Sequence, residues 1–567
     1  MIPASGPAGF VAGRLGATHL PWADTQRSIA GDIDLRTWGD PVRVGDGVVL
    51  TAVRRRRGGQ VGAAEIDRLA RDDPAALSGL LPPFAVAAAL PDGLRLIGDF
   101  MGFRHLYLTR QPSDPAAVSS SALALADAVQ APLDHEAVAV QSLLGWQLAD
   151  RTMFKGVRKL PAGAVADLRA TGIELRDGPA PDDTPIDFAD AVTAAARVLR
   201  ESLAALLDDH PEAVLQLTGG MDSRLLLSAI PAPRRKGLRA MTLAVPGSGD
   251  VAIASLVAQR YGIRHDVHGL TDLGALDREE AHRLCLDAAL RLDAMADPVA
   301  LAAQSIAERT FDQGVRISGL GGEIARGFYY LGRVVDRGFD RSDAVRLADW
   351  RMFANESVEP GLLVADFASW ARHTAHDAVY AALRSGGDEW MRATDRLYLG
   401  HRMQRWAGAT DVAVSAQRTV INPMLDPEFV AIAGRLRPNQ KRAGRFLAAV
   451  QMELDPELGR VPLDGRPAPA FFAAPPVHAP VVQALVVGRK AGRKVIQRAR
   501  RGNRAPAGGD VLAARVVQHW RAEPSVLDPI AELDFIDGRW LRDVLDGHTE
   551  PRPSSVAFVT NLLAATS

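Results

Sequence analysis

The feature that most constrains the fold is a run in which an apolar strand passes through two glycines directly into a helix. Residues 214–223 read VLQLTGGMDS, and the chain continues as RLLLSA. The apolar residues suit a buried parallel strand, and Gly219 and Gly220 allow backbone angles that other residues avoid. A strand, a glycine turn and a helix in immediate succession predict one unit of a parallel α/β sheet.

The same turn predicts an anion site that contains an acid. Unpaired N–H groups and the positive end of the helix dipole favour bound phosphate at such a turn. Asp222 lies inside it, so a cation must neutralise this side chain beside the phosphates, and Mg²⁺ is the usual one. We therefore expect Asp222 to be a metal ligand; a plain helix cap is the alternative.

Length and charge bound the class of protein. At 567 residues the chain is too long to fold around a single hydrophobic core. Its formal net charge of -1 gives no bulk attraction to nucleic acid or membrane, so we expect neither as a partner. The single cysteine, Cys285, fits a reducing cytoplasm, and no apolar stretch is long enough to span a membrane. The basic stretch 489–504 is expected to be a solvated helix, with contact to RNA or an acidic leader peptide as the alternative.

Two patterns divide the chain into domains. Up to about residue 175, short apolar runs such as 48–50 and 84–87 alternate with Gly, Pro and Asp, which predicts a β-rich layered domain over residues 1–175. Residues 176–183 are polar and turn-forming, which predicts a linker. A second domain is expected over residues 186–567.

In the second domain, strands alternate with helices. Further strands are expected at 240–245 and 315–318, each followed by a loop that contains glycine. This alternation predicts a doubly wound parallel sheet, and ligands of such sheets bind at the carboxyl ends of the strands. We therefore expect the three loops to meet. After residue 340, the helical spacing of Trp, Arg and Leu predicts a helical C-terminal part.

Three motifs, in this order, resemble the asparagine synthetase superfamily: TGGMDS at 218–223, SGLGGE at 318–323 and NPMLD at 422–426. The first is similar to the pyrophosphatase loop of N-type ATP pyrophosphatases, and residues 98–107 and 154–163 are similar to a class II glutaminase domain. The resemblance covers nearly the whole chain. It implies an N-terminal layered α+β domain of the Ntn (N-terminal nucleophile) type, then a doubly wound parallel-sheet ATP pyrophosphatase domain with a helical C-terminal part.

The resemblance implies an ATP-dependent ligase. A substrate carboxylate attacks the α-phosphorus of ATP, pyrophosphate leaves, and an amine then displaces AMP to form an amide. The implied cofactors are ATP and Mg²⁺, the implied partners are a small-molecule or peptide carboxylate and an amine, and a homodimer is left open. The implied ATP- and pyrophosphate-binding residues are Thr218, Gly219, Gly220, Asp222, Ser223, Met241, Thr242, Leu243 and Gly319, and the implied metal ligands are Asp222 and Glu323. For residues 241–243, a plain core strand is the alternative.

The family also places a lysine late in the synthetase domain, over the leaving pyrophosphate or the intermediate. Arg466 is the nearest equivalent and Lys441 competes for this catalytic role, with a solvated surface charge as the alternative for each. An arginine there can stabilise an oxyanion but stays charged, so it does not act as a base. Asp395 and Arg396 are expected to lie on a solvated helix face.

The departures from the family pattern bear on the reaction. Ile2 stands where class II glutaminases have their nucleophilic cysteine, and an alkyl side chain cannot attack an amide. Cys285 lies in an expected helix, where a buried structural thiol is the expectation. Leu320 and Glu323 stand where asparagine synthetases have Glu and Asp. We therefore expect a degenerate glutaminase domain and an acyl donor such as a small β-carboxylate, a natural-product precursor or a lasso-type peptide. Asparagine synthetase using ammonia and a silent nucleotide-binding pseudo-synthetase are the alternatives.

Overall fold

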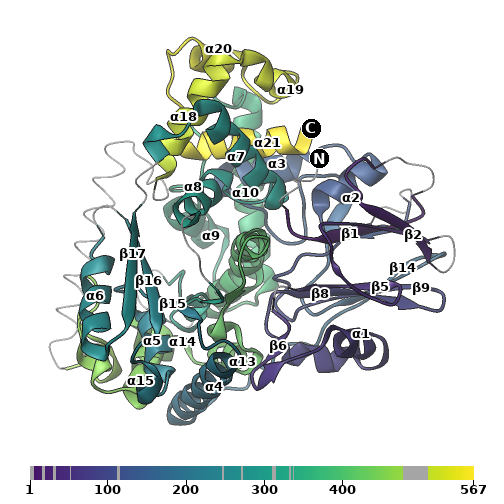
Figure 1. Cartoon of the computed structure of the whole chain (residues 1–567). Helices are drawn as coiled ribbons and strands as arrows, with labels where there is room; N and C mark the ends of the chain where they lie inside the picture. The colour runs from purple at the N-terminus through teal and green to yellow at the C-terminus, as the bar shows by residue number, and fades with distance from the viewer. Residues whose placement is uncertain are drawn as a thin grey trace.

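Two sheet systems with helices between them make up the molecule (Figure 1). The structure is a computed structural model, and it describes residues 6–15, 20–29, 33–51, 53–110, 115–245, 248–269, 273–309, 314–330, 334–335, 337–476 and 508–566. Ile2 and the basic stretch 489–504 lie outside the described residues.

The N-terminal part consists of two six-stranded antiparallel sheets. The strand order in the first sheet is β12 (Val157–Lys159), β10 (Tyr107–Thr109), β11 (Ala117–Ser119), β1 (Gly9–Gly13), β3 (Ile33–Trp38) and β2 (Thr25–Ile29). The order in the second is β14 (Gly172–Arg176), β13 (Val165–Arg169), β9 (Gly93–Gly98), β8 (Phe84–Leu90), β5 (Gly47–Thr51) and β4 (Val42–Val44).

Alternating side chains bury both faces of these sheets. Phe10 and Ala12 of β1 point into the core between the sheets, whereas Val11 packs with helical residues on the outer face. Helix α2 (Ala122–Val129) contacts the first sheet, and α1 (Ala63–Asp72) contacts the second. The result is a layered helix–sheet–sheet–helix arrangement, which confirms the expected layered α+β N-terminal part.

The second sheet system is fully parallel, and its strand order reverses at its centre. The order is β17 (Arg264–Gly269), β16 (Arg239–Ala244), β15 (Val214–Gln216), β18 (Arg316–Ile317) and β19 (Val420–Ile421). The chain moves outward through β16 and β17, then crosses to the other side of β15 at β18. A reversal of this kind opens a crevice at the carboxyl ends of the two central strands. The predicted doubly wound sheet is confirmed.

Helices surround this sheet and fill the space towards the N-terminal part. Those flanking the sheet are α4 (Phe188–Asp209), α5 (Met221–Ala229), α6 (Asp250–Tyr261), α13 (Pro427–Arg435), α14 (Pro438–Lys441) and α15 (Arg445–Leu454). Those further along include α7 (Arg278–Arg291), α8 (Pro298–Glu308), α10 (Ala365–Ser385), α11 (Trp390–Leu397), the π-helix η7 (Tyr398–Gly408), α18 (Gly509–Ala522) and α21 (Pro553–Thr566). The expected helical C-terminal part is confirmed. Among the described residues, no helix is both long and apolar enough to cross a membrane.

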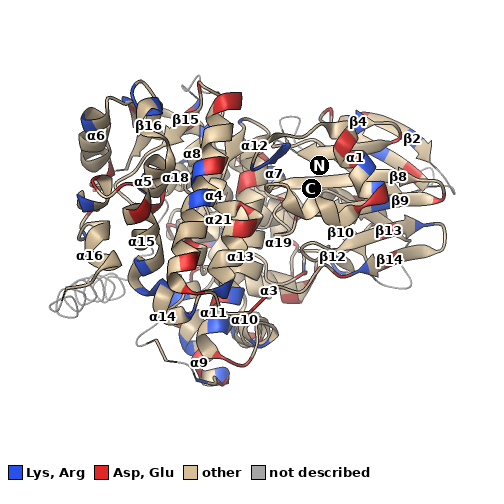
Figure 2. Cartoon of the chain, turned by 90° about the horizontal axis from the view of Figure 1, so that it is seen from below, with Lys and Arg blue, Asp and Glu red and all other residues tan. Residues whose placement is uncertain are grey.

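The two parts share a hydrophobic core. Strand β14 ends at Arg176 and α4 begins at Phe188, so the division between residues 175 and 186 falls between a strand and a helix. Even so, α3 (His135–Leu144) packs against α10, and Val11 shares one buried cluster with Leu512. Acidic and basic residues are interspersed along the helices in Figure 2, in keeping with the near-zero net charge.

Candidate nucleotide and metal site

The glycine turn after β15 is held by its own hydroxyl groups. Thr218 donates its backbone N–H to Ser223 Oγ at 3.0 Å, and the two hydroxyl oxygens also lie 3.0 Å apart. Gly220 caps α5 without a side-chain bond and donates its N–H to Thr218 Oγ1 at 3.1 Å. The turn is therefore preformed at the carboxyl end of β15, where α5 begins.

An acid from the second loop already contacts the predicted phosphate-binding turn. Asp250, the first residue of α6, accepts the Gly219 N–H on Oδ1 at 2.8 Å. Asp464 approaches from the other side, and its N–H donates to the Gly219 carbonyl at 3.0 Å. A Cβ at Gly219 would lie 2.9 Å from Asp464 Cβ, so this close approach requires glycine. A carboxylate on the Gly219 N–H indicates that this donor favours an anionic partner.

The third loop, after β18, packs directly on Asp222. A Cβ at Gly319 would lie 3.1 Å from the Ser223 nitrogen, and one at Gly322 would lie 2.3 Å from Asp222 Oδ1. Gly321 has a φ of 106°, a conformation that favours glycine. The three loops therefore meet at the strand ends, as expected from the sheet type.

Two carboxylates come together at this junction, one from the segment that follows β15 and one from the segment that follows β18. Arg326 Nη2 donates to Asp222 Oδ2 at 2.8 Å and to Glu323 Oε1 at 2.5 Å, so both acids lie within hydrogen-bond distance of one nitrogen. Burial raises the pKa of Asp222 to about 6, an effect that Arg326 opposes and Glu323 reinforces. Arg326 was not among the site residues predicted from the sequence.

The chemistry of this pair fits a divalent cation. Asp222 Oδ1 is buried and has no hydrogen-bond partner among the described residues, which leaves one carboxylate oxygen to be satisfied by something else. No cluster of three or more His, Cys, Asp or Glu side chains suited to a metal occurs in the described part of the chain. Two carboxylates alone still suit Mg²⁺, which commonly takes one or two from the protein and the rest of its ligands from phosphate and water.

The two predicted catalytic cations have different surroundings. Leu463 and Arg466 exchange backbone hydrogen bonds in a tight turn, and burial lowers the pKa of Arg466, as does nearby Arg326, while Asp222 opposes the shift. Lys441 lies elsewhere: its Nζ donates to Asp395 Oδ2 at 2.8 Å, and the side chain is 2 % exposed. Arg466 therefore interacts with Asp222 of the site, whereas Lys441 pairs with Asp395 outside it.

The prediction of a solvated face for Asp395 is wrong. Its Oδ2 accepts from both Lys441 and Tyr330, the latter at 2.9 Å, and its side chain is 19 % exposed. Sequence periodicity identified the helix but not the two donors, which come from segments 65 and 46 residues away along the chain.

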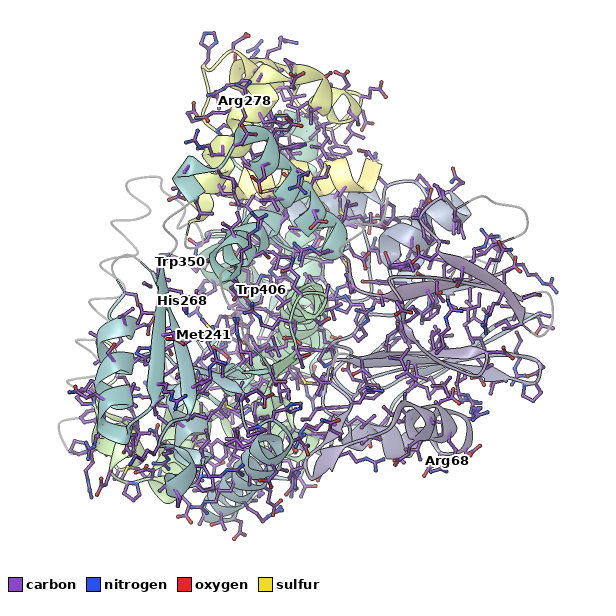
Figure 3. All side chains as sticks on the ribbon, viewed as in Figure 1. Arg68, Met241, His268, Arg278, Trp350 and Trp406 are labelled. Atoms are coloured by element: carbon purple, nitrogen blue, oxygen red, sulfur yellow. The ribbon has the colours of Figure 1, made fainter. Side chains whose placement is uncertain are left out.

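The strand expected to frame adenine extends beyond its neighbour. Strand β15 pairs with β16 only as far as Gln216 and Met241, and the Met241 carbonyl accepts from Leu217 N–H at 2.9 Å. Main-chain groups alternate in direction along a strand, so those of Leu243 point to the side where β15 has ended. Thr242 is buried and donates its hydroxyl to the Leu217 carbonyl at 2.7 Å. Met241, labelled in Figure 3, lies on β16.

The sequence of the N-terminal part contains no cysteine. The one cysteine of the sequence, Cys285, is buried in α7, and burial raises the pKa of its thiol. The expected burial of this thiol is confirmed. Asp99 is buried too, and it accepts the N–H groups of Phe84, Met101, Phe103 and Arg104 at 2.8 to 3.3 Å.

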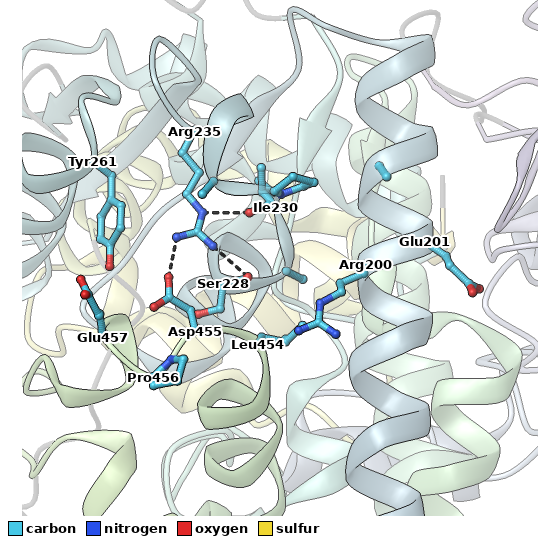
Figure 4. A pocket seen from close by; sticks show the side chains of 14 residues that line it. Arg200, Glu201, Ser228, Ile230, Arg235, Tyr261, Leu454, Asp455, Pro456 and Glu457 are labelled. Atoms are coloured by element: carbon cyan, nitrogen blue, oxygen red, sulfur yellow. Dashed lines mark hydrogen bonds and ion pairs between the residues drawn. The ribbon is translucent and has the colours of Figure 1, made fainter.

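A cavity of about 680 Å³ lies at the opposite end of α5 from the glycine turn (Figure 4). It is lined by Ala229 and Ile230 at the end of that helix, by Tyr261 and by Asp455. Arg235 donates to the carbonyls of Ser228 and Ile230 and pairs with Asp455. This cavity contains none of the predicted site residues, which lie at the start of α5 instead.

Comparison with known proteins bears on the second half of the chain. Residues 194–447 match the family model described as asparagine synthase. A search of curated proteins finds no match. Among solved structures, the allosteric regulatory enzyme of purine biosynthesis matches at 10% identity, covering 47% of this chain and 75% of that chain, with a TM-score of 0.20, too low to support any further comparison. The region that matches this family model spans β15, β16 and β18 with all three loops of the site.

Proposed function

We propose that this chain adenylates a substrate carboxylate with ATP and then transfers the acyl group to an amine, without hydrolysing glutamine. The asparagine synthase family, whose model matches residues 194–447, is one of ATP-using, amide-forming ligases. The single observation that carries the proposal is that Asp222 and Glu323, from the ends of β15 and β18, bracket one cationic group.

In this proposal the chain mainly positions groups and neutralises charge. Asp222 and Glu323 would hold Mg²⁺, which supplies charge neutralisation at the phosphates when bound. The turn of Thr218, Gly219, Gly220 and Ser223 would bind the β- and γ-phosphates, with Gly319 closing the crevice against it. Leu243 would offer its main chain to adenine, with Met241 and Thr242 setting the strand in place. Arg466 would stabilise the leaving pyrophosphate, because it shares the surroundings of Asp222.

Two features support a reaction that does not use glutamine and does not make asparagine. The only thiol of the sequence is buried in α7, so cysteine-dependent amide hydrolysis has no exposed nucleophile. Leu320 is partly buried against the main core beside the site, and an alkyl side chain there can neither bind an amino group nor move a proton. A small acid or a peptide carboxylate is the proposed acyl donor.

The test is exchange of labelled pyrophosphate into ATP, with Mg²⁺ and a panel of acids that includes aspartate, glutamate and peptides bearing either side chain. Exchange that depends on one of these acids supports adenylation. Binding of ATP without exchange for any acid would contradict it and would favour a nucleotide-binding pseudo-synthetase. Release of glutamate from glutamine above that of boiled protein would contradict the second part of the proposal.

A further inference from the structure

Arg326 occupies a distinctive place in the candidate site. It follows η5 (Gly322–Ala325), the short helix that carries Glu323, and its side chain is 23 % exposed. A single nitrogen of its guanidinium donates to one oxygen of Asp222 and one of Glu323. These are the two acids assigned above to the divalent cation.

We propose that Arg326 is a resident counter-ion that competes with the divalent cation for Asp222 and Glu323, so that the cation binds only when the guanidinium has left them. This inference rests on the proposed function, because it takes the two acids as the metal ligands.

The geometry makes the two cations mutually exclusive. Mg²⁺ binds oxygen at about 2.0–2.1 Å, so an ion shared by Asp222 Oδ2 and Glu323 Oε1 would need the space that Arg326 Nη2 now fills. The positive charges of the guanidinium and of a metal ion bound next to it would also repel each other strongly in a partly buried site. Asp222 Oδ2 and Glu323 Oε1 therefore bind either the guanidinium or a shared metal ion.

The competition has a consequence for the order of binding. The apparent affinity of a ligand falls by the fraction of protein that is in the competent state. If the state with both acids free is a minor one, populated at about 10 % or less, a free divalent ion binds at least about tenfold more weakly than the acids alone would allow. A nucleotide changes this balance, because its phosphates can accept the released guanidinium in charge-assisted hydrogen bonds. Arg326 would thus make metal binding depend on the nucleotide.

The proposal is tested by Mn²⁺ binding to the full chain without nucleotide, measured by electron paramagnetic resonance of the free ion. Arg326→Gln and Arg326→Met both remove the positive charge, the first with a polar and the second with an apolar side chain. Both are compared with Arg326→Lys, which keeps the charge. Arg337→Gln is the matched control, because Arg337 pairs with Asp343 at 2.7 Å on the same segment and contacts neither acid of the site.

The expected result is Mn²⁺ binding at least about tenfold tighter in the two uncharged variants, with Arg326→Lys and Arg337→Gln close to the wild type. Equal or weaker binding in both uncharged variants would overturn the proposal.

Asp222→Asn separates this inference from the proposed function. If it weakens Mn²⁺ binding in the presence of ATP while the Arg326 variants change nothing, the counter-ion role fails and the metal site stands. If Asp222→Asn leaves Mn²⁺–ATP binding unchanged, the proposed function itself fails, and the role of Arg326 fails with it.

Discussion

The two halves of the molecule bury charged groups in different ways. In the N-terminal sheets, the Asp99 carboxylate accepts four backbone N–H groups and so has no bonding capacity to offer a ligand. At the centre of the parallel sheet, Asp222 is also buried, yet its Oδ1 has no hydrogen-bond partner among the described residues. A saturated buried acid stabilises a fold, whereas an unsaturated one beside a second acid has a free energy cost that a bound cation can offset. The contrast suggests a structural role for the first half and a chemical role for the second.

The largest expected effect is on chemistry, in the parallel-sheet half. Asp222→Asn keeps the shape of the side chain but removes a metal ligand, which costs several kcal/mol of transition-state stabilisation. We expect pyrophosphate exchange to fall by about a thousandfold or more. Asp343→Asn is the control, because Asp343 is also a partly buried acid paired with an arginine, outside the site. Exchange within a few fold of the wild type in Asp222→Asn would remove the contrast between the halves.

The second effect is on stability, in the N-terminal half. Asp99→Ala leaves four buried N–H groups without their acceptor, and we expect a loss of about 3–5 kcal/mol in the free energy of unfolding. Urea unfolding measures it, with Asp92→Ala as the control, because Asp92 is exposed at the end of the same pair of strands. The rate of pyrophosphate exchange per folded molecule should be unchanged. A loss of exchange without a loss of stability would show that the first half takes part in the chemistry.

A third prediction concerns pH and the contact between the halves. Lys159 is buried, and burial together with Arg405 lowers its pKa to about 7, while its Nζ donates to the Leu160 carbonyl and to Gln404 of η7. Between pH 7 and about 10 the unfolded chain keeps a proton on this lysine that the folded chain lacks, so stability rises with pH in that window. The gain is at most about 1.4 kcal/mol per pH unit.

Lys159→Met tests this origin of the pH dependence. Unfolding in urea at pH 7 and pH 9 should show a smaller rise in stability for the variant than for the wild type, because the other titrating groups are common to both proteins. The same rise in both proteins would mean that Lys159 is charged in the fold and would contradict its lowered pKa.

The smallest effect is steric, at the same contact. A Cβ at Gly408 would lie 2.7 Å from the Phe103 carbonyl oxygen, a backbone atom of the N-terminal part. We expect Gly408→Ala to cost about 1–2 kcal/mol, since overpacking outweighs the better helix propensity of alanine. Gly400→Ala in the same helix has open space and should be neutral or stabilising by up to about 1 kcal/mol. Thermal unfolding of the pair measures the difference, and equal midpoints would indicate a loose interface.

The sequence alone predicted the features that depend on neighbouring residues. The apolar run and glycines around Gly219 specify a strand, a turn and a helix, and the glycines around Gly322 do the same for the third loop, so both acids could be placed at strand ends. Strand β19 was missed, because a pair of residues, Val420–Ile421, gives no readable period.

The contacts that complete the site depend on tertiary structure. Nothing in the local pattern indicates that Asp250 binds the Gly219 N–H or that Asp395 meets both Lys441 and Tyr330. Arg326 is the exception, because an arginine three residues after Glu323, on the same helical turn, is a recognisable ion-pair spacing. That spacing was the signal that could have identified it.

The most direct test of the central claim is a double-mutant cycle on Mn²⁺ binding in the presence of a non-hydrolysable ATP analogue. We predict that Asp222→Asn and Glu323→Gln each remove most of the affinity and that the double variant loses little more, because both side chains act on one shared ion. Independent, additive losses, or a loss in only one of the two variants, would contradict a shared metal site.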